Sequence, residues 1–285
     1  MSSASLSGRV LLDVTGDDAE EFLQNIITTD LETLGPGDLR PGALLSPQGK
    51  ILFDFLVSRI GDGLRLDLPS TSADDLLKRL TLYRLRAKVQ FAVDSESVIE
   101  VFWNDDPAAS QSESTIVDRR FPAALNVKRR YGGVAGAAGG NDGWNTLRIS
   151  CGVAEAPDDF PLGDAFPHDV NLDQTGGVSF KKGCFVGQEV VSRMQHRGTA
   201  RRRILVATGA TDLPHPGTPL TAGGREIGTL GTTEGRSGLA LARIDRVKEA
   251  MDAGTPILAG AISLDLAIPP EHRFTFPVTT LAERT

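Results

Sequence analysis

The spacing of apolar residues changes along the first hundred residues and predicts alternating strands and helices. Short apolar runs at residues 9–15 and 51–57, and strict alternation at residues 64–68, are typical of strands. After Asp17 and Asp18, either of which can cap a helix, apolar residues recur at helical spacing (Ala19, Phe22, Leu23, Ile26 and Ile27). A second helix is predicted from about Ser72 to Lys88, with further strands near residues 89–93 and 98–102. This order predicts a small α+β unit with helices on one face of an antiparallel sheet.

The middle of the chain is less regular. Residues 104–114 are polar, and the glycine-rich segment Gly132–Gly143 predicts a loop or linker. These glycines do not follow a strand and open a helix, which argues against a dinucleotide-binding fold. Helices are predicted at residues 144–153, with Cys151 packed in the core, and again from about Val186, with Gln188 and Glu189 in its first turn.

From Arg203 onward, short strands alternate with glycine and proline turns. The runs at residues 204–208, 218–222, 225–232 and 238–244 are followed by a last pair at residues 256–259 and 261–267. Short strands at this spacing predict a small barrel or sandwich. We therefore predict two domains, residues 1–200 and residues 201–285.

The composition indicates a globular protein of ordinary polarity. The 285 residues carry 30 Lys and Arg against 37 Asp and Glu, a net charge of −7. No apolar run approaches the roughly 18 residues that a membrane-spanning helix needs, and the N-terminus shows no secretory signal. Two cysteines, Cys151 and Cys184, argue against a disulfide framework. These features predict a reducing, cytoplasmic compartment and no membrane partner.

Positive charge gathers in one stretch, which runs from Val178 to Arg203. Between Lys181 and Arg203 the only acid is Glu189, and there are seven basic residues: Lys181, Lys182, Arg193, Arg197, Arg201, Arg202 and Arg203. In an acidic chain this excess indicates an anionic ligand or partner. A solvated basic strand edge explains the charge equally well. An RNA-binding face is a weaker alternative, because the stretch lacks interleaved aromatic residues.

Cys184 stands out within this stretch. Gly183 and Gly187 flank it, and glycine permits tight turns and a close approach to a ligand. Two neighbouring lysines and a following helix start should favour the thiolate form. The alternative is a buried cysteine that packs as a small apolar side chain.

Two further polar residues have open roles. Asp54 lies among apolar neighbours in the strand at residues 51–57, where its carboxylate either contacts a ligand or makes a structural hydrogen bond. His168 is either a donor to a ligand or an ordinary loop side chain.

The stretch from Phe166 to Arg193, with its core K-G-C-F-V-G-Q-E, resembles the signature of the YgfZ-type folate-binding proteins. These are bacterial relatives of a mitochondrial factor for iron–sulfur cluster assembly, within the superfamily of the glycine-cleavage T-protein. Residues 14–24, 45–54, 227–232 and 238–243 also resemble this family.

The resemblance implies an α+β, three-lobed T-protein-like fold. Two α+β lobes, the second at roughly residues 60–145, and a C-terminal β-barrel would surround a central opening that binds tetrahydrofolate. It implies that Cys184 is the functional thiol, with Lys182 beside it. We expect Cys184 to act as a thiolate that ligates a transient iron–sulfur cluster or reacts with a partner thiol. The residues expected to bind the folate are Asp54, Arg148, His168, Lys181, Gly183, Gly187, Gln188, Glu189 and Arg193.

Departures from the T-protein bear on the mechanism. Only one carboxylate, Asp54, remains of an acidic pair, and Ser150 and His168 stand where acids are expected. We therefore expect an accessory factor without independent turnover, whose partners are folate and iron–sulfur assembly proteins or client enzymes. One cysteine cannot supply all the ligands of a cluster, so a partner, a second subunit or a small thiol must supply the others. The alternative is a tetrahydrofolate-dependent aminomethyl or one-carbon transferase in which Asp54 acts as base.

Overall fold

The computed structural model describes residues 2–104, 115–133 and 142–277. Part of the predicted glycine-rich loop, residues 134–141, and most of the predicted polar loop, residues 105–114, lie outside these ranges. The chain divides into two compact units. Unit 1 comprises residues 1–144, 162–167 and 172–193, and unit 2 comprises residues 145–161, 168–171 and 194–285.

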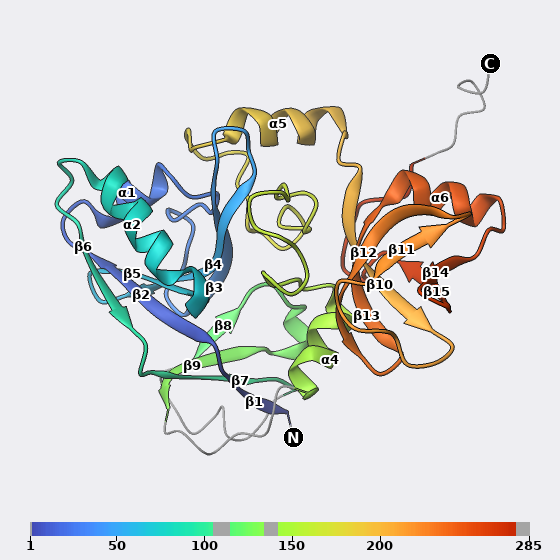
Figure 1. Ribbon diagram of the computed structural model, residues 1–285. Helices are drawn as coiled ribbons and strands as arrows, with labels where there is room; N and C mark the ends of the chain where they lie inside the picture. Colours follow the sequence, from blue (N-terminus) through green and yellow to red (C-terminus); the bar gives the residue numbers. More distant parts are fainter. Residues whose placement is uncertain (1, 105–114, 134–141, 278–285) are drawn as a thin grey trace. The chain divides into compact units, whose positions relative to one another are not determined.

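Unit 1 is built on a mixed sheet that has nine strands in the described part of the chain (Figure 1). The order is β1-β7-β9-β8-β3-β4-β5-β2-β6. Strands β3 and β8 run parallel, whereas the other described neighbours are antiparallel. The strands are β1 (Ser3–Leu6), β2 (Arg9–Thr15), β3 (Asp38–Leu45), β4 (Ile51–Ile60), β5 (Gly63–Pro69), β6 (Gln90–Asp94), β7 (Val98–Phe102), β8 (Ile116–Asp118) and β9 (Lys128–Gly133).

The main core of unit 1 lies between this sheet and two helices, α1 (Ala19–Gln24) and α2 (Ala73–Arg84). Alternate residues of β2, β4 and β5 point into it, as the period of two in a strand requires. Phe22 and Leu23 come from α1, and Leu76 and Leu80 from α2. Short 3₁₀ turns lie at Ser70–Ser72 and Ala123–Leu125.

Both helices are shorter than the apolar spacing predicts. Asp18 occupies the N-cap position of α1 but makes no side-chain cap; its carboxylate accepts a hydrogen bond from the Lys88 amide, at 2.7 Å. Helix α2 ends at Arg84 rather than near Lys88, because Leu85 adopts φ 45° and ψ −104°. A helix cannot continue through that conformation.

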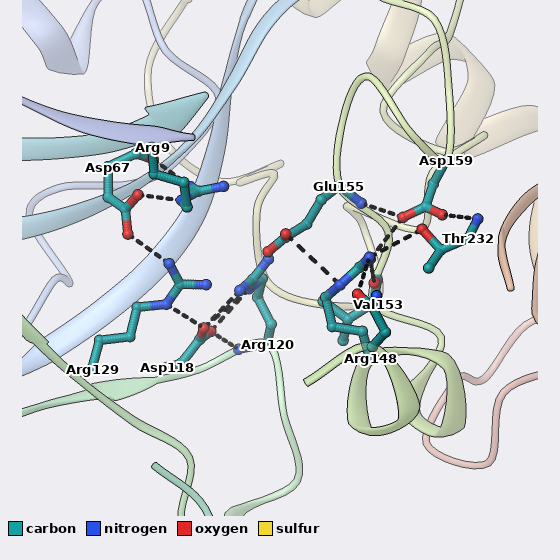
Figure 2. Close-up of polar contacts among 11 residues, drawn as sticks. Arg9, Asp67, Asp118, Arg120, Arg129, Arg148, Val153, Glu155, Asp159 and Thr232 are labelled. Atoms are coloured by element: carbon teal, nitrogen blue, oxygen red, sulfur yellow. Dashed lines mark hydrogen bonds and ion pairs between the residues drawn. The ribbon is translucent and has the colours of Figure 1, made fainter. Parts of the chain in front are cut away.

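A buried network of charges ties the strands of unit 1 together (Figure 2). The Arg129 guanidinium on β9 donates to Asp67 on β5 at 2.6 Å and to Asp118 on β8 at 3.3 Å, and none of these side chains is exposed. Arg9 on β2 donates to the second oxygen of Asp67, and Arg120 pairs with Asp118. Burial raises the pKa of the Asp118 carboxyl, but the charges of its arginine partners outweigh burial and hold the pKa below its ordinary value.

Unit 2 contains the predicted C-terminal barrel, which is closed and has six strands in the described residues (Figure 1). They follow the order β10-β13-β12-β11-β14-β15: β10 (Arg202–Gly209), β11 (Pro219–Ala222), β12 (Arg225–Glu234), β13 (Ser237–Arg243), β14 (Ile257–Ala259) and β15 (Ile262–Ala267). Leucine, isoleucine and alanine side chains fill the interior. Helix α6 (Ile244–Asp252), which the sequence analysis did not predict, packs Val247 and Ala250 onto this core.

Two further helices lie between these parts in the sequence. They are α4 (Asp142–Cys151) and α5 (Gln188–Arg197). Helix α4 lies close to the helix predicted at residues 144–153, and α5 begins close to the start predicted at about Val186. In the described residues, no helix has the length and hydropathy to cross a bilayer.

Candidate functional site: the Cys184 loop

Cys184 is exposed near the end of the loop that leads into α5. We call residues 177–187 the thiol loop. Phe185, next to the cysteine, is buried, so the loop is held to unit 1 on one side while the thiol faces outward. The structure therefore excludes the alternative of a core cysteine at this position.

The first half of the thiol loop is hydrogen-bonded to the segment Ile27–Thr29, about 150 residues away in the sequence. The Thr28 hydroxyl donates to the Gly177 carbonyl at 2.6 Å, and the Ser179 amide donates to the Thr28 carbonyl at 2.9 Å. The Ser179 hydroxyl then accepts from the amides of Lys181 and Lys182. These bonds fix the path of the backbone on the N-terminal side of Cys184.

Lys182 adds a side-chain clamp to this anchor. Its Nζ donates to the carbonyl oxygens of Ile27 at 2.9 Å and Thr29 at 2.7 Å, and the ammonium lies 5.5 Å from the centre of the Phe185 ring. Burial lowers the pKa of the Lys182 amine to about 8, while Asp30 and Glu32 act in the opposite direction. Lys182 was predicted to stand beside the thiol as part of the catalytic machinery; the structure shows its amine engaged with backbone carbonyls.

The second half of the thiol loop meets the turn Ser46–Gly49 through glycine. Gly187 has φ +78°, and a Cβ built there would lie 2.5 Å from the Ser46 carbonyl oxygen and 3.0 Å from the Gly49 Cα. Gly49 has φ +80°, and its Cβ would lie 3.1 Å from Val190 of α5. Two backbones thus touch at a place where only glycine fits. Gly183 has open space around its Cβ position, so no such constraint applies there.

The predicted basic surface is smaller than the sequence suggests. Arg193 pairs with Glu189 one helical turn away at 2.7 Å, and Arg202 pairs with Asp169 at 2.8 Å. Arg203 is buried in β10, where it donates to the His168 carbonyl and stacks on Phe274. Lys182 is also engaged. In the described structure, the remaining cations of the stretch, whose side chains make no hydrogen bond, ion pair or ring contact, are Lys181, Arg197 and Arg201.

Asp54 lies on β4, and its place in the strand distinguishes it from its neighbours. Phe53 and Phe55 point into the core of unit 1, so Asp54 projects from the opposite face of the sheet and is only partly buried. It pairs in register with Ala43 of β3. A carboxylate at this position is compatible with either role that the sequence left open.

Two predicted folate ligands, Arg148 and His168, lie in unit 2 and are engaged with protein groups. The Arg148 guanidinium, which is 2% exposed, donates to Asp159 at 2.7 Å, to the Val153 carbonyl and to Thr232 (Figure 2). His168 is also buried, and its Nε2 lies 3.0 Å from Gln195 Oε1. Both side chains therefore fit a structural role better than a ligand contact.

The remaining predicted residues have plain surroundings. Gln188 begins α5, and its backbone N–H donates to the Phe185 carbonyl at 3.2 Å. Ser150, which stands where the T-protein has an acid, donates its hydroxyl to the Leu147 carbonyl. Cys151 is buried as predicted, and burial raises the pKa of its thiol. The described residues contain no group of three or more His, Cys, Asp or Glu that could hold a metal ion.

Sequence reasoning missed the residues that hold the thiol loop, namely Thr28, Ser46 and Gly49. None of them has unusual chemistry, and all lie far from Cys184 in the sequence. The segment S-P-Q-G-K, residues 46–50, is typical of a turn and contains Ser46 and Gly49. It was the signal for the turn, but nothing in it shows that the turn contacts the thiol loop.

Comparisons with known proteins agree with this architecture. Residues 201–274 match the family model described as the C-terminal β-barrel domain of CAF17. The mitochondrial iron–sulfur cluster assembly factor IBA57 of Homo sapiens is 32% identical over 277 residues, which cover 85% of this chain and 78% of that protein. The mouse protein of the same name is 30% identical with the same coverage, and the IBA57 homologue of Pyricularia oryzae is 28% identical over 90% of this chain and 75% of its own.

A solved structure supports the predicted fold class. Aminomethyltransferase T of the glycine cleavage system from Bartonella henselae superposes with a TM-score of 0.72 and 17% identity, covering 95% of this chain and 87% of that chain. At this identity the likeness concerns the fold alone. It confirms the predicted α+β T-protein-like fold, and the closed barrel matches the predicted C-terminal domain.

The comparisons overturn one prediction. We expected a cytoplasmic protein, but the relatives described above are all mitochondrial by name. The expectation rested on the scarcity of cysteine and on the lack of a recognised secretory signal, and neither feature distinguishes one reducing compartment from another.

Proposed function

Since the chain belongs to the family of the IBA57 iron–sulfur cluster assembly factors, we propose that it supports cluster assembly through the exposed thiol of Cys184. The observation that carries the proposal is the presentation of this thiol: an exposed cysteine on a loop that is fixed at both ends. A thiolate is the usual protein ligand of an iron–sulfur cluster.

In this proposal Cys184 acts together with another molecule. No described cluster of side chains in this chain could complete the coordination of a metal ion. A cluster held by Cys184 would take its remaining ligands from a partner protein or a small thiol. The chain would thus serve as one side of a shared site, and its partners would be iron–sulfur assembly proteins or client enzymes.

The test is complementation of cells that lack their own factor of this family, with the activities of iron–sulfur enzymes as readout. We expect wild type and Cys151→Ala to restore these activities and Cys184→Ala to fail. All three proteins should accumulate to equal levels in the cells. Cys151→Ala is the matched control, because it removes the buried cysteine and leaves the exposed one. Full restoration by Cys184→Ala would reject the proposal.

We propose further that the protein binds a reduced folate, with Asp54 as an acceptor for N–H groups of the pterin ring. The support is the resemblance of the sequence to folate-binding proteins and the position of Asp54 on the sheet face opposite the core. A carboxylate accepts paired N–H donors well. Arg148 and His168 do not fit this role, since their polar groups already bond to the protein.

Tetrahydrofolate binding can be followed by calorimetry on the purified protein. Asp54→Asn should weaken binding about tenfold or more, because one charge-assisted acceptor becomes an amide. Unchanged affinity would remove Asp54 from the site. If the purified protein instead transfers one-carbon units to tetrahydrofolate and Asp54→Asn abolishes the transfer, the aminomethyltransferase alternative replaces the accessory role.

A further inference from the structure

The chain continues past the last barrel strand as a segment that lies on the barrel of unit 2. We call residues 268–277 the C-terminal strap. In the described structure these residues belong to no helix or strand. Ile268, Phe274 and Phe276 pack against the barrel core, whereas Glu271 and Arg273 are exposed. Because the strap joins no sheet, its side-chain contacts decide whether it stays closed on the barrel.

The strap covers the end of α4, where Cys151 lies. A Cβ built on the next residue, Gly152, would overlap the Pro269 ring and would lie 3.4 Å from His272 Cε1. Cys151 is buried. Burial raises the pKa of its thiol, and the charge of Glu271 on the strap acts in the same direction. The strap therefore lies beside this thiol and helps to separate it from water.

A polar contact between Asn171 and His272 latches the strap to unit 2. Asn171 is fully buried, and its Nδ2 donates to the Ile204 carbonyl at 2.9 Å and lies 3.0 Å from His272 Nδ1. The Ile204 carbonyl fixes the orientation of the amide, because a reversed amide would place one oxygen against another. His272 Nδ1 therefore accepts a hydrogen bond, so the imidazole is neutral and carries its proton on Nε2.

A second proton on His272 would break this contact. An imidazolium has a hydrogen on both nitrogens, so its Nδ1–H would face the N–H of Asn171. The Arg203 guanidinium adds to the cost, since it lies 4.6 Å from the centre of the Phe274 ring, which in turn is 6.2 Å from the His272 ring. Glu271 would favour the imidazolium, but its side chain is exposed and water screens its charge.

Other titratable and charged groups lie on the strap and on the segments that touch it. They are Cys151 at the end of α4, His168 and Asp169 before Asn171, Arg202 and Arg203 on β10, and Glu271 and Arg273 on the strap itself. Arg202 pairs with Asp169, and Arg203 donates to the His168 carbonyl. Within this set, His168 is the other group of a type that changes charge near neutral pH. An acid effect on the strap therefore has to be traced to one of two imidazoles by substitution.

We propose that the C-terminal strap is an acid-released cover for Cys151, held closed by neutral His272 and opened when this imidazole takes up a proton. A histidine in water binds a proton near pH 6.5. Below that pH the open strap binds a proton that the closed strap excludes, so the open population rises up to about tenfold for each pH unit. The opened chain presents Cys151 as a second accessible thiol. The cover is independent of cluster assembly, since it contains no residue of the thiol loop.

The test follows Cys151 in the Cys184→Ala protein, in which it is the remaining thiol. Dithiodipyridine labels thiols in mild acid as well as at neutral pH, and the urea-unfolded protein at the same pH gives the rate without protection. The ratio of unfolded to native rate should fall about tenfold from about pH 7.5 to about pH 5.5. A ratio that does not change over this range would overturn the proposal.

His272→Gln in the same background separates His272 from His168. Glutamine can accept the bond from Asn171 through its oxygen and does not titrate, so the ratio should no longer depend on pH. His215→Gln is the matched control: it removes an exposed histidine whose ring contacts Pro216, and it should leave the tenfold fall in place. An equal fall in His272→Gln would assign the effect to another group and reject the latch.

Hydrogen exchange on the wild-type chain needs no substitution. The amides of residues 271–273, of which that of His272 donates to the Pro269 carbonyl at 3.0 Å, should lose protection at about pH 5.5 after correction for the intrinsic exchange rate. The amides of β10 and β13 should stay protected. If these barrel strands lose protection together with the strap, acid unfolds unit 2 as a whole, and the strap is not a separate cover.

Discussion

At the scale of single residues, the two cysteines show how the surroundings of a thiol set its chemistry. Cys151 is buried, and burial raises the pKa of its thiol, since the charged thiolate loses its hydration. Cys184 is exposed on the thiol loop. The thiolate is the nucleophile that attacks alkylating reagents and partner disulfides, so the two residues should differ sharply in reactivity although neither forms a disulfide.

Iodoacetamide should therefore label Cys184 well before Cys151 in the native protein. We expect at least a tenfold difference in rate near neutral pH, followed by mass spectrometry of the peptides, and equal labelling once urea unfolds the chain. Comparable native rates would mean that the region around Cys151 opens readily, contrary to the packed structure.

Lys182 leads to a prediction about pH. Its pKa is about 8 in the folded protein, below the ordinary 10.5, so between these values the unfolded chain binds more protons than the folded one. Stability from this residue should therefore rise as pH increases from about 8 toward 10.5. Below pH 8 both states carry the charge, and its desolvation cost is fully present.

The measurement is urea unfolding of wild type and Lys182→Met across this range. The difference in unfolding free energy should move in favour of wild type as pH rises from about 8 to about 10. A difference that stays constant would show that the two carbonyl acceptors, with Asp30 and Glu32, keep the amine charged throughout.

At the scale of elements, the thiol loop depends on the contact between two glycine-containing turns. Gly187→Ala should destabilise the protein by at least about 1–2 kcal/mol, because alanine resists a left-handed conformation and its Cβ would meet the Ser46 carbonyl. Gly183→Ala is the matched control in the same loop: its Cβ position is open, and we expect a change within about 0.5 kcal/mol. Urea unfolding compares the two, and a larger loss for Gly183→Ala would contradict the assigned contacts.

The elements also show what the sequence could predict. Local patterns located β2, the barrel strands and the start of α5, since each has its own apolar period or turn residues. They missed the early end of α2, because the conformation of Leu85 is unusual for leucine. They also overestimated the basic surface, since nothing local shows that Lys182 and Arg203 turn toward carbonyls far away in the sequence. Candidate chemistry was thus visible in the sequence, whereas its anchoring depends on long-range contacts.

At the scale of the whole molecule, each unit buries charge among its own elements. In unit 1, Arg129 of β9 links Asp67 of β5 to Asp118 of β8, and Arg9 of β2 pairs with the same Asp67. Removal of one member leaves its partners charged without access to water. Arg129→Met should therefore cost about 3–5 kcal/mol of stability. Arg246→Met, which breaks an exposed pair with Glu249, should cost about 0–1 kcal/mol.

Thermal unfolding of both variants is the comparison. If Arg129→Met proves as stable as wild type, the network is replaceable by apolar packing, as occurs for some buried ion pairs. Equal losses for the two variants would instead show that burial contributes nothing to the value of these contacts.

The double anchoring of the thiol loop has a consequence for the kinetics and affinity of complex formation. A flexible cysteine arm would lose backbone and side-chain entropy when a partner captured it, and that loss would weaken the complex. Here folding has already restricted the residues on both sides of Cys184, through Thr28, Lys182 and Gly187. A partner would meet a preorganised thiol, and loosening either anchor should raise the dissociation rate even when the sulfur atom remains in place.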